Sequence, residues 1–185
     1  MANVTSDMLT YNFILLSESE HIEIDYAPLD KIEPRFWFYS RLNKYRFPED
    51  ALMLSWGEFI HSHKYIRSFH SIGGFLGIIA GYDEVKILNL PVHYTYSLWH
   101  HYAKQYTEFL EVLETINAQA PSPKKIAKDM SEFGLTNITD FLSSAKGVSS
   151  KEIESMNCYE LIAEYKREIY KDLNRRAQLK TNKND

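Results

Sequence analysis

Two long stretches of the chain carry apolar residues at intervals of three and four, the spacing that places side chains on one face of an α-helix. The first stretch follows Pro48, and its stripe extends over residues 52–70. The second follows Pro91, and its stripe extends over residues 92–113. Both stripes have the seven-residue repeat that is typical of coiled coils. We therefore expect two long antiparallel helices that form a scaffold.

The N-terminal region has a different period. Residues 11–16 form a largely apolar run, and residues 21–26, beyond a polar linker, alternate between apolar and polar side chains. Alternation is typical of a β-strand with one buried face. The pattern predicts a β-hairpin over residues 9–26. Because an isolated hairpin is only marginally stable in water, we expect it to pack against the long helices.

Residues 71–90 connect the two predicted helices and contain a cluster of glycines alternating with large apolar residues. The cluster lacks the Gly-Lys-Ser/Thr ending of a phosphate-binding loop. It indicates either a tight corner where glycines let backbones approach, which we favour, or an apolar loop held for a partner. Residues 85–90 predict a short strand that joins the hairpin.

The C-terminal third has its own helix signals. Pro121 and Pro123 mark a boundary, and Gly134 fits the end of a short helix that begins there. A second short helix is expected to end at Gly147. The Ser149 and Glu152 pair predicts a capping box before the last, long helix, which we place over residues 157–180.

These elements together predict an α+β fold that is mainly α: an N-terminal β-hairpin packed on two long antiparallel helices, followed by a helical C-terminal subdomain. We expect the hairpin and helix pair over residues 1–120, two short helices and one long helix over residues 121–180, and a disordered tail over residues 181–185.

Charge supports the same division. The whole chain has a net charge of −4, but residues 1–120 are acidic and residues 121–185 are slightly basic. Aromatic residues make up 14% of the chain, and tyrosine and tryptophan are favoured at protein interfaces. The acidic N-terminal part means that a second copy of the chain is one candidate partner for the basic C-terminal helix. The lone Cys158 excludes an internal disulfide.

Histidines are the first candidates for catalytic chemistry. On the predicted helices His63 and His70 share a face, and His100 faces them from the second helix. These three are weak metal candidates, because metal ligands must converge and Arg67 between the first two repels a cation. We expect no catalytic residue, no metal and no cofactor. A histidine-based metal-dependent enzyme is the third functional hypothesis.

Residues 141–156 resemble the helix-turn-helix of repressor-like DNA-binding domains. Leu142, Gly147 at the turn, Ile153 and Met156 carry the resemblance. It implies a DNA-binding regulator that uses residues 139–158, which is the alternative function. The helix in the position of a recognition helix has acidic side chains where it would have to contact the phosphates of DNA. We therefore do not expect nucleic acid as the main partner.

The function that we expect is a non-enzymatic protein–protein interaction or assembly subunit of a larger complex, such as a phage head–tail, mobile-element or secretion-type structural protein. Its partner is another protein or a second copy of the chain, with no small-molecule substrate. No segment has the length of a membrane span, and the first residues lack the features of a secretion signal, so we expect a cytoplasmic protein or one incorporated into an intracellularly assembled particle. The residues expected to contact the partner are Phe75, Ile78, Ile79, Tyr94, Tyr102, Tyr159, Tyr170, Lys171, Arg175 and Arg176.

Overall fold

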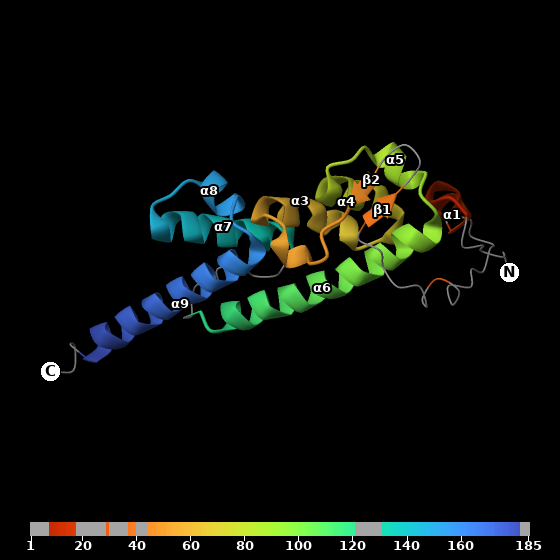
Figure 1. Ribbon diagram of the computed structural model, residues 1–185. Coiled ribbons are helices and arrows are strands. Elements are labelled where there is room, and N and C mark those ends of the chain that lie inside the picture. The colour runs from red at the N-terminus through yellow and green to blue at the C-terminus, as the bar shows by residue number, and fades with distance from the viewer. Residues whose placement is uncertain (1–7, 18–28, 30–36, 40–43, 121–130, 182–185) are drawn as a thin grey trace. The chain divides into compact units, whose positions relative to one another are not determined.

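The computed structural model describes residues 8–17, 29, 37–39, 44–120 and 131–181 (Figure 1). The chain divides into two compact units. Unit 1 contains Met1–Ala51 and His61–Tyr106, and unit 2 contains Leu52–Ile60 and Thr107–Asp185. Two helices, α3 (Trp56–Ile66) and α6 (Val92–Ala118), contribute residues to both units. The predicted boundary near residue 120 remains a prediction, because residues 121–130 lie outside the described part of the chain.

Unit 1 is built mainly from helices. The second predicted long helix is confirmed as α6. Within unit 1 the end of α3 packs antiparallel to the start of α6, because Ser62 contacts Tyr106 (2.6 Å) and the Trp99 indole donates to the Ile66 carbonyl (2.9 Å). The remaining elements of this unit are α1 (Thr10–Ser17), β1 (Trp37–Tyr39), β2 (Lys44–Arg46), η2 (Phe69–Ser71), α4 (Ile72–Ala80) and α5 (Glu84–Leu88).

The predicted N-terminal β-hairpin is wrong, and with it the α+β class. Thr10–Ser17 is the helix α1, and Phe13 and Ile14 are both buried, as adjacent residues can be on a helix but not on a strand with one buried face. The Thr10 amide and hydroxyl both donate to the Leu90 carbonyl, which anchors this helix. The alternating run 21–26 lies outside the described residues. In another part of the described chain, β1 and β2 pair as two antiparallel strands of three residues each.

The first predicted long helix is shorter than expected. Instead of starting at Pro48, α3 starts at Trp56, where Ser55 and Glu58 form reciprocal hydrogen bonds of the capping-box kind. The carbonyls of residues 48–49 are used differently: Tyr102 donates to that of Pro48 and His101 to that of Glu49. A helix beginning at Pro48 is prevented because α6 holds this segment. Met53 belongs to a separate short turn, η1 (Ala51–Met53).

The glycine-rich segment is a helix rather than a loop. In α4, a Cβ on Gly73 would lie 2.7 Å from the Glu84 side chain, so glycine at this position permits the close packing of α4 and α5. Phe75 is fully buried at the other side of the helix. The strand predicted at residues 85–90 is wrong, since Asp83 caps α5 by accepting from the Val85 amide (2.8 Å).

Unit 2 contains η1's last residues, the start of α3, the end of α6, and α7 (Glu132–Lys146), α8 (Ser150–Glu154) and α9 (Cys158–Thr181). The predicted capping box of Ser149 and Glu152 is confirmed, as is the helix end at Gly147, whose φ of 68° is left-handed. Gly134 lies inside α7, which Ser131 caps, so its expected role as a helix end is wrong. The preceding short helix falls on residues outside the described part.

The core of unit 2 is centred on Trp56. Its ring is fully buried, stacks on Phe59 at 5.5 Å and lies 6.3 Å from Phe109 of α6. Its indole N–H donates to the Thr139 hydroxyl of α7 at 2.8 Å. The start of α3 is thereby fixed to both α6 and α7.

Candidate protein-interaction groove

Helices α6 and α9 lie side by side in unit 2 and run in the same direction (Figure 1). The buried Tyr165 hydroxyl of α9 donates to the Asn117 side chain of α6 at 3.1 Å. Burial raises the pKa of Tyr165 above its usual value, so this hydroxyl stays protonated and remains a donor. The bond places the last turn of α6 level with the first third of α9.

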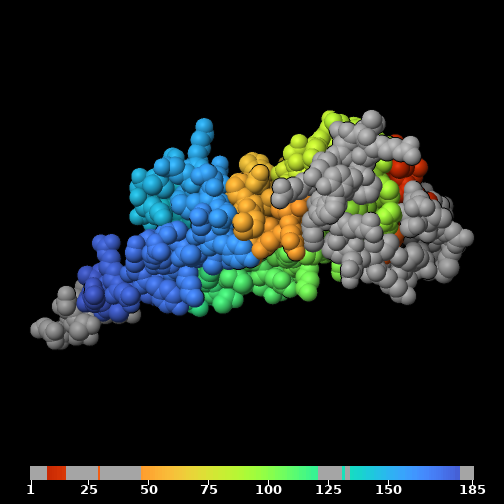
Figure 2. Space-filling view, in the orientation of Figure 1, coloured from red at the N-terminus to blue at the C-terminus, as the bar shows by residue number. Residues whose placement is uncertain are grey.

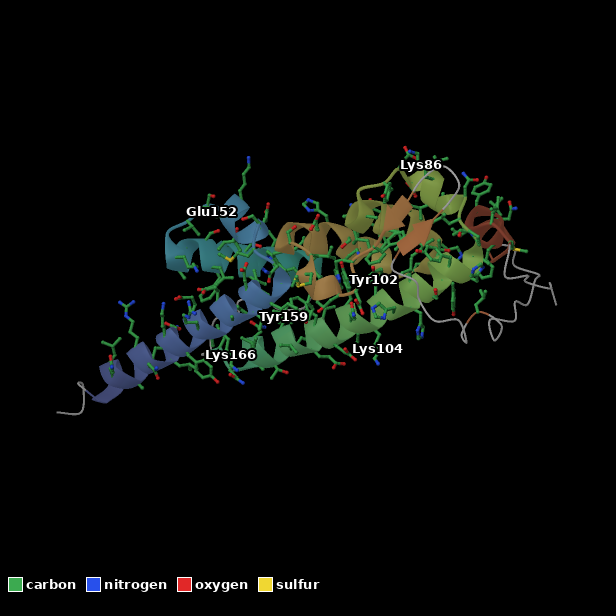
Figure 3. All side chains as sticks on the ribbon, viewed as in Figure 1. Lys86, Tyr102, Lys104, Glu152, Tyr159 and Lys166 are labelled. Atoms are coloured by element: carbon green, nitrogen blue, oxygen red, sulfur yellow. The ribbon has the colours of Figure 1, made fainter. Side chains whose placement is uncertain are left out.

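A groove of about 510 Å³ lies between these two helices. We call it the α6–α9 groove. Its lining comes from three successive turns of α6 and three turns of α9: Glu108, Glu111, Val112, Thr115, Ile116, Gln119, Ile162, Lys166 and Tyr170. In Figure 3 Lys166 lies on α9 beside the end of α6.

The groove exposes apolar side chains that a folded chain normally covers. Val112 is 44% exposed and Tyr170 is 45% exposed, whereas Ile116 at the base is only 5% exposed. Ile162 is partly exposed between them. Charged residues stand at the edges, with Glu108 and Glu111 on α6 and Lys166 on α9. An apolar base with a polar rim is the general composition of a protein–protein contact.

The C-terminal part of α9 continues past the end of α6 (Figures 1 and 2). The last buried residue of α9 is Ile169, and every described side chain from Tyr170 to Leu179 is at least partly exposed. From Tyr165 to the helix end, about 24 Å of helix follows the level of Asn117. Ion pairs within α9, such as Lys171–Glu168 (2.7 Å), support this segment.

Charge is distributed unevenly between the two helices. Residues 107–118 of α6 contain three glutamates and no cation, a net charge of −3. Residues 170–179 of α9 contain three cations and one acid, a net charge of +2. Glu111 takes part in no ion pair within the described chain, and the same holds for Arg175. The three glutamates of α6 are exposed, as are Lys171 and Arg175 of α9.

The first half of α9 is fixed to α7 by a different set of charges. Glu164 accepts from Lys146 at 2.7 Å and from Arg167 at 2.5 Å. The hydrogen bond from Lys146, aided by the nearby cations, holds the pKa of Glu164 below its usual value. A smaller hollow of about 310 Å³ between α7 and α9 is lined by both acids and cations of α9, two of which pair with each other.

The residues predicted to contact a partner fall into two groups. In unit 1, Phe75, Tyr94 and Tyr102 are at most 2% exposed, and Ile79 is 8% exposed, so they provide core packing; Ile78 is partly exposed. Burial also raises the pKa of Tyr102. In unit 2, Tyr159 and Tyr170 are 49% and 45% exposed, Lys171 and Arg175 are exposed, and Arg176 is partly exposed and pairs with Asp172 at 3.0 Å.

The sequence analysis missed most of the groove. It placed Tyr170 correctly on an exposed face but did not identify Val112, Ile162 or the lining acids. A signal was present, because Val112 lies off the predicted stripe of the second helix and beside Glu111. A single exposed apolar residue is ordinary on a protein surface, and it is the structure that places Ile162 and Tyr170 beside Val112.

The histidine candidates have different environments. His63 is buried, with Nε2 3.2 Å from the Arg67 guanidinium, whereas His70 and His100 are exposed. The described residues contain no group of three or more His, Cys, Asp or Glu side chains placed to hold a metal ion.

The segment that resembles a helix-turn-helix corresponds to α7 and α8. Its would-be recognition helix, α8, has five residues, with one lysine and two glutamates. Hydrogen bonds from the backbone and hydroxyl of Ser149 hold the pKa of Glu152 below its usual value, so α8 keeps a carboxylate at its start.

Comparison of the chain with protein-family models, with curated proteins and with solved structures gave no match. Within the described ranges, none of the helices combines the length and the apolar composition that crossing a membrane requires.

Proposed function

We propose that the protein is a non-enzymatic protein–protein interaction module, a subunit that joins a larger assembly through the α6–α9 groove. The observation that carries the proposal is the exposure of Val112 and Tyr170 in a groove of about 510 Å³ between two helices. Amphipathic helices bind such grooves by inserting residues spaced three and four apart.

The form of the groove supports a polypeptide partner over a small ligand. Its lining extends from Glu108 of α6 to Gln119 just past the end of that helix, about 16 Å along the helix axis. Three turns of contact match the length over which a helical segment presents its anchors. The end of α9 supports the same proposal, because no described side chain after Ile169 is fully buried and such a helix end gains little stability from packing.

The proposal is tested by placing a charge on the exposed apolar lining of the groove. Val112→Asp should abolish the native complex, since an acid there must lose water when a partner covers it. Ala118→Asp adds the same charge to the same helix at an exposed residue that does not line the groove. Both changes are on the surface, so folding should be retained.

The readout is the size of the complex that contains the protein in extracts of its own cells, measured by native electrophoresis and detected with an antibody. We expect the wild type and Ala118→Asp to migrate in a complex well above the 21.7 kDa of one chain, and Val112→Asp to migrate as the single chain. A wild type that migrates as a single chain, or a complex that survives Val112→Asp, contradicts the proposal.

A further inference from the structure

We infer that the occupant of the α6–α9 groove is an amphipathic helix of a partner protein that runs antiparallel to α6 and α9. This helix has cations in its last turns and acids in its first turn. The inference rests on the proposed function and specifies the chemistry and the direction of the partner. The positions of the charged residues along the groove determine both.

The two ends of the groove carry opposite charges. Glu108 and Glu111 of α6 are exposed at one end. Lys166 of α9 is exposed at the other end, beside the end of α6 (Figure 3). Their separation follows from the hydrogen bond that makes Tyr165 level with Asn117. With a rise of about 1.5 Å per residue in both helices, Lys166 lies about 10 Å beyond Glu111 along the groove.

The charges at the two ends are not neutralised by ion pairs within the described residues. Glu111 and Lys166 take part in no ion pair there, whereas Arg167 and Lys171 pair with other acids of α9. Charges at the edge of a contact select the partner and fix its register. The complementary occupant therefore brings cations to the acidic end of the groove and an acid to the basic end.

A helix fits this pattern in one direction. Acids in the first turn and cations in the last turn stabilise a helix, because these charges suit the helix dipole. Such a helix places its cations beside Glu111 and its acids beside Lys166 only when its last turn lies at the acidic end. Both α6 and α9 run from the acidic end toward the basic end (Figure 1). The occupant therefore runs antiparallel to both.

The apolar lining determines how long the contact is. Val112 and Tyr170 are 44% and 45% exposed. From the same level of Tyr165 and Asn117, these two side chains lie about 15 Å apart along the groove. That distance is about ten residues of a helix but only about four or five residues of an extended chain. A helix with apolar residues spaced three and four apart covers both side chains.

The direction is tested with a photo-crosslinking amino acid placed at position 112 or at position 170 of the full-length protein in its own cells. Mass spectrometry after irradiation identifies the partner peptide that is joined at each position. We expect both positions to join the same segment of one partner protein. The attachment from position 170 should lie about ten residues before the attachment from position 112 in the partner's sequence. Lysine or arginine should flank the later attachment, and aspartate or glutamate the earlier one.

The charge is tested separately with Glu111→Lys. Glu114→Lys is the matched control, because it makes the same change on the same helix at an exposed residue that does not line the groove. Circular dichroism verifies that both variants are folded. In native electrophoresis of cell extracts, the fraction of Glu111→Lys in the complex should be at least about tenfold smaller than that of the control, since its lysine then faces the cations of the partner.

Several results overturn the inference. They are attachments in the reverse order, attachments about five residues apart, attachment to a second copy of the chain, and no attachment at either position. A Glu111→Lys variant that stays in the complex as well as Glu114→Lys overturns it too. If any of these results is found while Val112→Asp removes the protein from its complex, the proposed function stands and the stated occupant is wrong. A complex that survives Val112→Asp contradicts the proposed function itself.

Discussion

The hydrogen bond between Trp56 and Thr139 gives the sharpest prediction about the fold. Thr139→Val replaces the hydroxyl with a methyl group of similar shape, so the indole N–H loses its acceptor. Trp56 is 0% exposed and Thr139 is 2% exposed, so water has no access to that N–H. An unsatisfied buried donor costs about 1–3 kcal/mol. For a chain of this size the melting temperature should fall by roughly 2–4 °C per kcal/mol.

Thr139→Ser is the matched control, because it keeps the hydroxyl and removes one methyl group, which costs about 0.8 kcal/mol. Thermal and urea unfolding followed by circular dichroism measure both variants. We expect Thr139→Val to be less stable than Thr139→Ser, and the cost of Thr139→Val to fall below about 0.5 kcal/mol when Trp56→Phe has removed the donor. The reasoning would be refuted if Thr139→Val and Thr139→Ser lowered the free energy of unfolding equally. It would also be refuted if Thr139→Val cost as much stability in the Trp56→Phe variant as in the wild type.

Three further predictions follow from the helix ends and buried tyrosine of unit 2. Gly147→Ala should lower the free energy of unfolding by about 1 kcal/mol, measured by urea titration, because alanine is strained at a φ of 68° although space around it is open. The lowered pKa of Glu152 means that its carboxylate stabilises the fold above about pH 4.3 and that this stability is lost as the pH falls through the lowered pKa. Glu152→Gln should therefore flatten the acid limb of a plot of melting temperature against pH. The raised pKa of Tyr165 acts at the other end of the pH range. The stability that its protonated hydroxyl contributes to the fold is fully present below about pH 10 and is lost as the pH rises further. Tyr165→Phe should therefore make alkaline unfolding less steep.

The helical periodicity predicted the second long helix and the C-terminal helix ends well. Ser149, Glu152 and Gly147 were identified because local hydrogen bonding and backbone conformation depend on residues close in sequence. The apolar stripe over residues 52–70 was also predicted, and Trp56 and Phe59 within it are buried on α3.

The N-terminal helix was missed because a long-range contact anchors it, and the helix predicted from Pro48 was wrong because α6 holds that segment, although Ser55 and Glu58 are a local capping-box signal for the observed start of α3. Thr10 is held by Leu90, and the carbonyl of Pro48 is held by Tyr102, contacts that no local pattern contains. The groove was missed for a related reason. It depends on Tyr165 meeting Asn117, which places two helices from distant parts of the chain side by side.

The central claim is that another polypeptide covers the α6–α9 groove. The most direct measurement replaces Val112 with a photo-crosslinking amino acid in the full-length protein in its own cells and identifies the joined peptides by mass spectrometry after irradiation. The account predicts an adduct in which position 112 is joined to a peptide of another polypeptide chain. No adduct between chains, or attachment equal to that from a probe at Ala118, would contradict it.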